Sequence, residues 1–132
     1  MSVILLRHAS AGDRAAWTGD DRLRPLDKRG RAQAIALRDI LRGLRVERVV
    51  SSPYVRCTQT VAPLELEIVP DERLAEGAEV EQTLELLREL DGAVACTHGD
   101  VIEAVLGHGL KKGAGVVLDP SLREVGKFRA VL

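Results

Sequence analysis

The sequence predicts an α/β fold, a three-layer α/β/α sandwich around a mainly parallel, mixed sheet. Short apolar runs with strand character recur along the chain, and stretches of helical periodicity lie between them. A length of 132 residues is enough to bury one core without disulfide bonds. We therefore expect a single domain over residues 1–132.

The first part of the chain predicts a strand, a loop and a helix. The strand is expected at residues 3–6, and a polar loop follows at residues 9–26. Long loops in compact domains tend to be functional. A helix is expected between Asp27, a suitable N-cap, and Gly43. Its apolar residues recur with the spacing of one helix face: Leu37, Ile40, Leu41 and Leu44.

The rest of the chain continues the alternation. The expected strands are residues 46–50, 66–69 and 93–97. The expected helices are residues 55–61, with Pro53 near the first turn, a segment marked by Val80, Leu84, Leu87 and Leu90, and residues 100–109. Residues 115–118 and 125–131, on either side of Pro120, are expected to form a closing β-hairpin.

Composition excludes several classes of function. The formal net charge is −1, and the aromatic residues are Trp17, Tyr54 and Phe128, so we expect no nucleic-acid or membrane partner. No apolar stretch has the length of a secretory or membrane-spanning segment. Two distant cysteines, Cys57 and Cys96, predict free thiols. We expect a cytoplasmic location and leave the oligomeric state open.

Two histidines follow predicted strands. His8 comes after Arg7 at the end of the first strand, and His98 follows the strand at residues 93–97. Parallel strands place such residues at one edge of the sheet. Arg56, in the first turn of a predicted helix, can reach the same edge with the helix amides. A neutral imidazole with guanidinium groups around it suits in-line attack on a phosphoryl group.

Two other chemistries fit poorly. A metal site built from His8, His98 and His108 would place two arginines beside the cation, so we expect no metal and no other cofactor. A cysteine phosphatase requires Cys-x5-Arg, but positions 63 and 102 are proline and isoleucine. We expect His108 to cap the end of its short helix.

Three segments together resemble the signatures of the histidine phosphatase superfamily, the phosphoglycerate-mutase-like clan. They are Leu6-Arg7-His8-Ala9, the stretch from Ser51-Ser52-Pro53 through Arg56 to Thr60, and Thr97-His98-Gly99. The stretch Asp21 to Gly30, with Arg24-Pro25-Leu26, is similar to small SixA-type phosphohistidine phosphatases. It is also similar to the histidine-phosphatase domain fused behind a Nudix domain in actinobacterial MutT-like proteins.

The resemblance implies a role for each matched residue. His8 would be the phosphorylated nucleophile, with Arg7, Arg56 and His98 as the phosphate pocket and the Gly99 amide as a helper. Leu74-Ala75-Glu76 matches the segment that carries the family's proton donor, which makes Glu76 the expected acid. Its rivals are Glu72, Glu79 and Glu81.

Three more residues are candidates for substrate binding. Trp17 could stack on a base or sugar, Tyr54 could line the rim, and Arg22 could bind a second phosphate, although packing of loop against helix explains the two aromatic residues equally well. Arg14, Arg24 and Lys28 are expected on the solvated surface.

We expect a metal-independent phosphatase that hydrolyses a phosphomonoester or phosphohistidine through a phosphohistidine at His8. Its partner would be a phosphorylated small molecule, a nucleotide or a phosphohistidine protein. The alternatives are a phosphatase for a nucleoside diphosphate, of the Nudix-partner type, and a non-catalytic domain that binds a phosphorylated ligand. Nothing in the sequence resembles a lid, so mutase activity is not expected.

Overall fold

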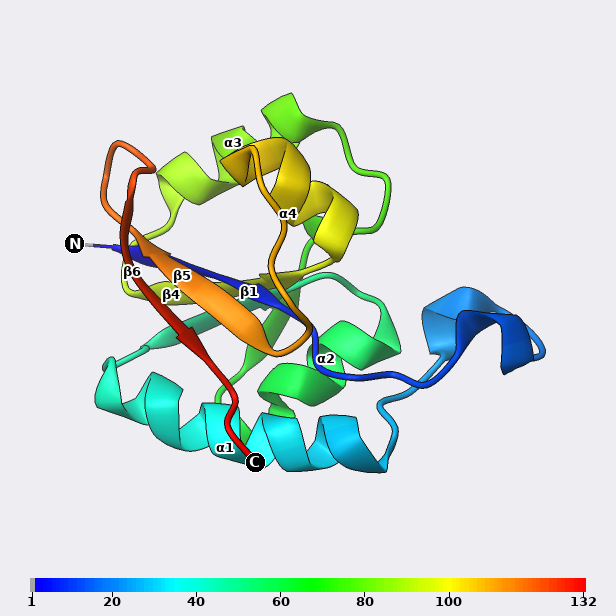
Figure 1. Ribbon diagram of the computed structural model, residues 1–132. Coiled ribbons are helices and arrows are strands. Elements are labelled where there is room, and N and C mark those ends of the chain that lie inside the picture. The colour runs from blue at the N-terminus through cyan, green and yellow to red at the C-terminus, as the bar shows by residue number, and fades with distance from the viewer. Residues whose placement is uncertain (1) are drawn as a thin grey trace.

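The computed structural model describes residues 2–132, and a six-stranded sheet runs through its middle (Figure 1). The strand order is β3-β2-β4-β1-β5-β6. The strands are β1 (Val3–Arg7), β2 (Arg48–Ser51), β3 (Ile68–Pro70), β4 (Ala93–Thr97), β5 (Ala114–Leu118) and β6 (Glu124–Arg129). The first four pair in parallel, and β5 and β6 add an antiparallel hairpin. The predicted mixed, mainly parallel sheet is confirmed.

Helices cover both faces of this sheet. The helices α1 (Lys28–Gly43) and α2 (Val55–Val61) lie on one face, and α3 (Val80–Glu89) and α4 (Gly99–Leu106) lie on the other (Figure 1). Side chains of β1 alternate between two cores: Leu5 packs with Leu87 and Ile102, whereas Leu6 packs with Leu37. Because both faces are covered, β1 and β4 are apolar along almost their whole length.

Several predicted boundaries were wrong. The predicted limits of α1, Asp27 and Gly43, are confirmed, but Leu44, which was counted on its apolar face, lies beyond the helix with 44% of its surface exposed. The second strand begins at Arg48 and the third at Ile68, each two residues later than predicted. Apolar periodicity is poor at locating ends, because the residues that connect two elements are also apolar here.

The helix at the C-terminal side of His98 is also shorter than predicted. It ends at Leu106 because Gly107 adopts a left-handed conformation with φ of 81°. His108 therefore does not cap the helix. Its ring instead contacts Glu124 on β6, at 2.7 Å, and the carbonyl of Gly109.

The loop at residues 9–26 is tied to the start of α1. It contains two short 3-10 turns, η1 (Arg14–Ala16) and η2 (Asp21–Leu23). Asp27 caps α1 by accepting from the Gly30 amide at 2.7 Å, and its second oxygen accepts from Ser10 Oγ at 2.8 Å. The loop backbone passes so close that a Cβ on Gly30 would lie 1.8 Å from the Ser10 carbonyl oxygen.

This contact predicts a position-specific effect of alanine on α1. Gly30→Ala should lower the free energy of unfolding by about 3 kcal/mol, because either the loop or the helix must move to admit the methyl group. Gly43→Ala is the control: nothing lies within 4 Å of its added Cβ, and it should be neutral or stabilise by up to ~1 kcal/mol. Urea unfolding measures both. Equal effects would contradict the proposed contact.

Candidate active site

The pairing of β1 with β4 brings the two predicted histidines together. The strands are neighbours in parallel register, with Arg7 opposite Thr97, so His8 and His98 leave the sheet side by side. The His8 amide donates to the Thr97 carbonyl at 3.1 Å, and the imidazole centroids are 5.4 Å apart. Both histidines are buried. The predicted convergence at one sheet edge is therefore present.

The surroundings of His8 leave one of its ring nitrogens with a free lone pair. Its Nδ1 lies 2.8 Å from the Ala9 carbonyl oxygen, which can only accept, so the proton is on Nδ1 and the Nε2 lone pair is free. Burial, together with the charges of His98, Arg56 and Arg7, lowers the pKa of His8 to about 3. His8 is thus neutral near pH 7, the form that can attack phosphorus.

Arg7 lies flat against the start of α4. Its Nη1 donates to the Leu110 carbonyl at 2.6 Å, which fixes the guanidinium. A Cβ on Gly99 would lie 2.9 Å from the central guanidinium carbon, so this approach requires glycine. Gly99, predicted to help bind phosphate through its amide, therefore also makes room for Arg7.

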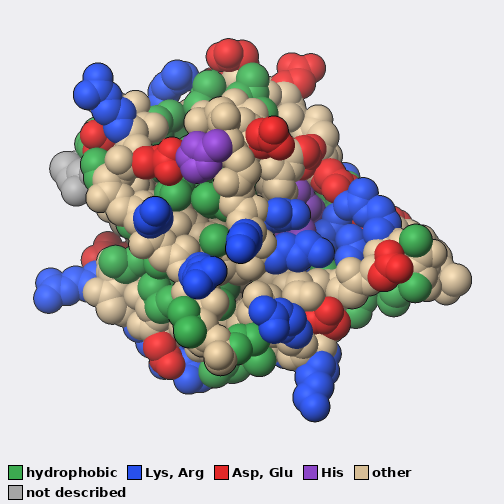
Figure 2. Space-filling view, viewed as in Figure 1, with side chains coloured by type: hydrophobic (Ala, Val, Ile, Leu, Met, Phe, Trp, Pro, Cys, Tyr) green, Lys and Arg blue, Asp and Glu red, His purple; other side chains and the backbone are tan. Residues whose placement is uncertain are grey.

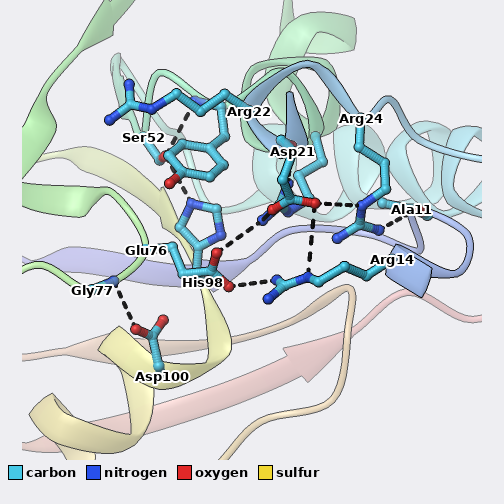
Figure 3. A network of polar contacts seen from close by, with 12 residues as sticks. Ala11, Arg14, Asp21, Arg22, Arg24, Ser52, Glu76, Gly77, His98 and Asp100 are labelled. Carbon is cyan, nitrogen blue, oxygen red and sulfur yellow. Dashed lines mark hydrogen bonds and ion pairs between the residues drawn. The ribbon is translucent and has the colours of Figure 1, made fainter. Parts of the chain in front are cut away.

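Arg56 is completely buried at the start of α2 and meets two acidic residues. Its Nη1 donates to the Asp21 carbonyl at 2.8 Å and its Nη2 to Asp21 Oδ2 at 3.0 Å. Glu76 Oε2 lies 3.5 Å from the same Nη2. Figure 3 shows Asp21 at the centre of this network, with Arg24 on one side and Glu76 nearby. Asp21 was not predicted as a site residue.

His98 is oriented by a serine that the sequence interpretation also missed. Its Nε2 lies 2.8 Å from Ser52 Oγ, and that oxygen accepts from the Tyr54 amide at 3.2 Å. The Ser52 hydroxyl can donate its hydrogen to Nε2, and in that tautomer the His98 ring proton is on Nδ1. The Tyr54 ring packs edge-on against His98 at 4.6 Å. Ser52 lies within the predicted phosphatase segment, so its position was a usable signal.

Three buried donors around His8 have no partner. Within residues 2–132, the buried side-chain nitrogen and oxygen atoms without a hydrogen bond are Arg7 Nε, Arg56 Nε and His98 Nδ1. Each belongs to a residue of the predicted phosphate pocket. An unsatisfied buried donor costs about 1–3 kcal/mol, so three of them around one imidazole fit an anion that would accept from all three.

A cavity of about 540 Å³ is lined by Arg7 and His98, whereas Arg56 is fully buried and does not line it. Lysine and arginine side chains gather in this region, where the 9–26 loop meets the body of the domain (Figure 2). The lining includes Arg7, His8, Glu76, His98 and Gly99 from the predicted set, and Arg14, Arg24 and Lys112 in addition. Arg14 and Arg24 were expected on the solvated surface. Arg24 is instead buried, with 6% of its surface exposed.

Among the four candidate acids, Glu76 is the one that lines the cavity. Its Oε1 accepts from Arg14 Nη2 at 2.5 Å, so its two oxygens face two different guanidinium groups. Glu72 is exposed and pairs with Arg22 at 3.0 Å. Glu79, just before α3, and Glu81, in its first turn, are also exposed. Glu76 therefore remains the candidate for proton transfer.

The three predicted substrate-binding side chains lie outside the cavity lining. The Trp17 Nε1 donates to the Asp20 carbonyl at 3.0 Å within the loop. Arg22 lies over the Tyr54 ring at 4.8 Å while it pairs with Glu72. Tyr54 packs between Arg56 and His98. Tyr54 thus packs against two residues of the site, whereas Trp17 remains 38% exposed on the loop.

Two further findings concern residues 2–132. No group of three or more histidine, cysteine, aspartate or glutamate side chains is arranged to hold a metal ion. None of the helices in this range combines the length and the apolar character needed to cross a bilayer.

The sequence profile of the histidine phosphatase superfamily (branch 1) matches residues 3–89, which include His8, Arg56 and Glu76. The chain belongs to this superfamily. A curated relative, the 8-oxo-(d)GTP phosphatase of Mycolicibacterium smegmatis, is 39% identical over 116 residues, covering 80% of this chain and 36% of the relative. The chain thus spans about a third of that relative's length.

Solved structures of similar fold cover nearly the whole chain. A protein of Agrobacterium tumefaciens assigned as the phosphohistidine phosphatase SixA is 26% identical, with a TM-score of 0.76 and 96% of each chain covered. A tungstate complex of the protein histidine phosphatase SixA is 21% identical, with a TM-score of 0.80 and coverage of 98% of this chain and 97% of the other. The phosphoglycerate-mutase-like fold predicted from the sequence is confirmed.

The buried neutral His8 predicts a pH dependence of stability. Its pKa is about 3 in the folded state and 6.5 when exposed, so between these values the unfolded chain binds more protons. The free energy of unfolding should therefore fall by up to about 1.4 kcal/mol per pH unit as the pH drops below 6.5. Urea unfolding between pH 7 and 4.5 should show a shallower slope for His8→Asn.

The control for this measurement is His108→Asn. His108 is exposed, and its pKa is raised by its hydrogen bond to Glu124, so the stabilisation it gives is present at low pH and is lost as the pH rises. Removing it should leave the slope unchanged or make it steeper. A His8→Asn slope equal to that of the unmodified protein would show that His8 is not held neutral.

Proposed function

We propose that this chain is a metal-independent phosphatase in which His8 Nε2 is the covalent nucleophile. The observation that carries the proposal is the set of three unpartnered donors, on Arg7, Arg56 and His98, around a neutral buried imidazole. Donors prepared in this way stabilise the charge of a transferring phosphoryl group without reorganising during the reaction. Membership of the histidine phosphatase superfamily supports the same reaction class.

The reaction has two steps. His8 Nε2 attacks phosphorus, a P–N bond forms, and the bond to the leaving oxygen or nitrogen breaks with its electron pair going to the leaving group. Water then attacks the phosphohistidine, releasing inorganic phosphate and returning His8 to its neutral form. The guanidinium groups of Arg7 and Arg56 and the His98 Nδ1–H bind the equatorial oxygens in both steps.

Glu76 is our proposed proton-transfer residue. Its carboxylate oxygens pair with Arg14 and Arg56 at the cavity, where they can accept a proton from the attacking water. The first step needs no acid from Glu76 when the leaving group departs as a stable anion or takes its proton from solvent. This favours substrates with good leaving groups over simple alkyl phosphates.

The first test is trapping of the intermediate. Incubation with ³²P-labelled substrate and a rapid quench should leave an alkali-stable, acid-labile label in the unmodified protein and none in His8→Asn. Turnover of p-nitrophenyl phosphate should be unchanged by EDTA and should fall at least ~10³-fold in His8→Asn, because the variant has lost its nucleophile. His108→Asn is the matched control and should retain full activity.

A non-catalytic domain would give a different result. It would bind inorganic phosphate but show no turnover and no label with a phosphomonoester, a nucleotide or a phosphohistidine protein. That result would contradict the proposed function. Activity lost in EDTA and restored by a divalent cation would contradict the metal-independent mechanism.

A nucleoside diphosphate is the second candidate substrate, besides a phosphomonoester or phosphohistidine. The relative from Mycolicibacterium smegmatis is named for an oxidised guanine nucleotide. In this chain Arg14, Arg24 and Lys112 line the cavity beside His8, where they can meet a second phosphate. A diphosphate also provides a leaving group that departs as a stable anion.

Lys112 separates these substrates experimentally. Lys112→Ala should lower kcat/KM about fivefold for 8-oxo-dGDP and leave p-nitrophenyl phosphate unaffected, because one charge-assisted contact is worth ~1 kcal/mol. Lys111→Ala is the matched control, since Lys111 is next to Lys112 in the chain but does not line this cavity. A phosphohistidine protein assayed in parallel identifies the preferred class. Equal losses for both substrates would contradict a second-phosphate contact at Lys112.

A further inference from the structure

Asp21 contacts both terminal nitrogens of Arg56, whereas Glu76 contacts Nη2 alone. Its carbonyl oxygen accepts from Arg56 Nη1 at 2.8 Å and its Oδ2 accepts from Nη2 at 3.0 Å. One residue thus binds both terminal nitrogens of a fully buried guanidinium. The third nitrogen, Nε, is one of the unpartnered donors beside His8.

The second carboxylate oxygen of Asp21 joins the loop to the same cluster. Asp21 Oδ1 accepts from Arg24 Nε at 3.0 Å and lies 3.7 Å from Arg14 Nε. Arg24 is itself buried against the loop and donates to the Ala11 carbonyl. The carboxylate therefore compensates three guanidinium groups that would otherwise repel one another (Figure 3).

Asp21 is held in this position by its own backbone. It begins the η2 turn, which Asp20 caps by accepting from the Arg22 amide at 2.9 Å, and the Arg24 amide donates to the Asp21 carbonyl at 3.2 Å. Burial opposes its ionisation, but hydrogen bonds from Arg24 and Arg56 outweigh burial and lower the pKa of the carboxyl below its usual value. Asp21 is thus an anion on a fixed turn.

We infer that Asp21 is a positioning residue, which holds the Arg56 guanidinium so that its Nε–H is directed at the phosphoryl group. This inference rests on the proposed function. Asp21 does not touch the reacting atoms. It acts through Arg56, and it makes the 9–26 loop part of the active site. Because Nε has no partner, phosphate can bind it without displacing Asp21, so the carboxylate does not compete with the substrate.

A double-mutant cycle with Arg56 tests this inference. Asp21→Asn keeps the size of the side chain and removes its charge. It should weaken the binding of inorganic phosphate, measured by titration calorimetry, and lower kcat/KM, each by about tenfold or more. In the Arg56→Ala background, Asp21→Asn should change either quantity less than twofold, since the group through which it acts is gone. Asp21→Glu should recover part of the loss.

Asp20→Asn is the matched control. It lies next to Asp21, loses the same charge, can still cap η2, and makes no contact with a guanidinium of the site. Urea unfolding of each variant shows whether it is folded. If Asp21→Asn is too unstable to assay, Arg24→Lys replaces it in the cycle, since Arg24 binds the same carboxylate. A loss of phosphate binding and of kcat/KM that disappears in the Arg56→Ala background then supports the inference.

Three outcomes would overturn the inference. In the first, Asp21→Asn behaves like Asp20→Asn. In the second, the effect of Asp21→Asn persists undiminished in the Arg56→Ala background. In the third, the Asp21→Asn variant binds phosphate more tightly, which would make Asp21 a competing anion. Failure of the proposed function gives a different pattern, in which the unmodified protein neither turns over substrate nor forms a phosphoenzyme.

Discussion

The parallel, in-register pairing of β1 with β4 is the constraint on which the site depends. It places Arg7 opposite Thr97, so the residues that follow, His8 and His98, leave adjacent strands at the same height. The segment after β2 delivers Ser52 and Arg56 to the same edge, because β2 pairs with β4 on its other side. A slip of one residue would turn the side chains of β1 to the opposite faces and would separate the imidazoles.

This arrangement has an energetic consequence. Full burial of both sheet faces brings Arg56, His8 and His98 out of water, where charges are stable only with partners. The structure provides partners for some of these buried nitrogens and not for others. Asp21, Glu76 and the Leu110 carbonyl bind terminal guanidinium nitrogens, while three donors remain without partners. The protein's own groups therefore stabilise the terminal nitrogens, and the three atoms without a partner are the anion site that we propose.

Much of this could be predicted from residue pattern. Apolar runs located the strands, and their order placed His8, Arg56 and His98 at one edge, since the carboxyl ends of parallel strands meet there. The end of α1 at Gly43 was predicted correctly, although Leu44 was counted on its apolar face. The helix after His98 was predicted three residues too long because its end is set by Gly107. Patterns report which face is buried, but they do not report where backbone hydrogen bonds stop.

The contacts between distant segments could not be predicted in the same way. Asp21 stands in a polar loop, where an aspartate normally caps a turn or faces solvent, and nothing local indicates that it meets Arg56, 35 residues away. Arg24 was expected at the surface for the same reason. The role of Trp17 stays a prediction: its indole N–H donates to the Asp20 carbonyl within the loop, and 38% of its surface is exposed. Long-range pairing of charged loop residues depends on the whole fold.

Glu76 connects the electrostatics of the site to the choice of substrate. In the reaction that we propose, the two carboxylate oxygens of Glu76 face the guanidinium groups of Arg14 and Arg56 at the cavity. A carboxylate so placed is suited to the second step, in which water attacks the phosphohistidine. The first step then proceeds well when the leaving group is itself a weak base or is protonated by solvent. With Glu76 in the role that we propose, phosphoanhydride or phosphoramidate bonds should react faster than simple alkyl esters.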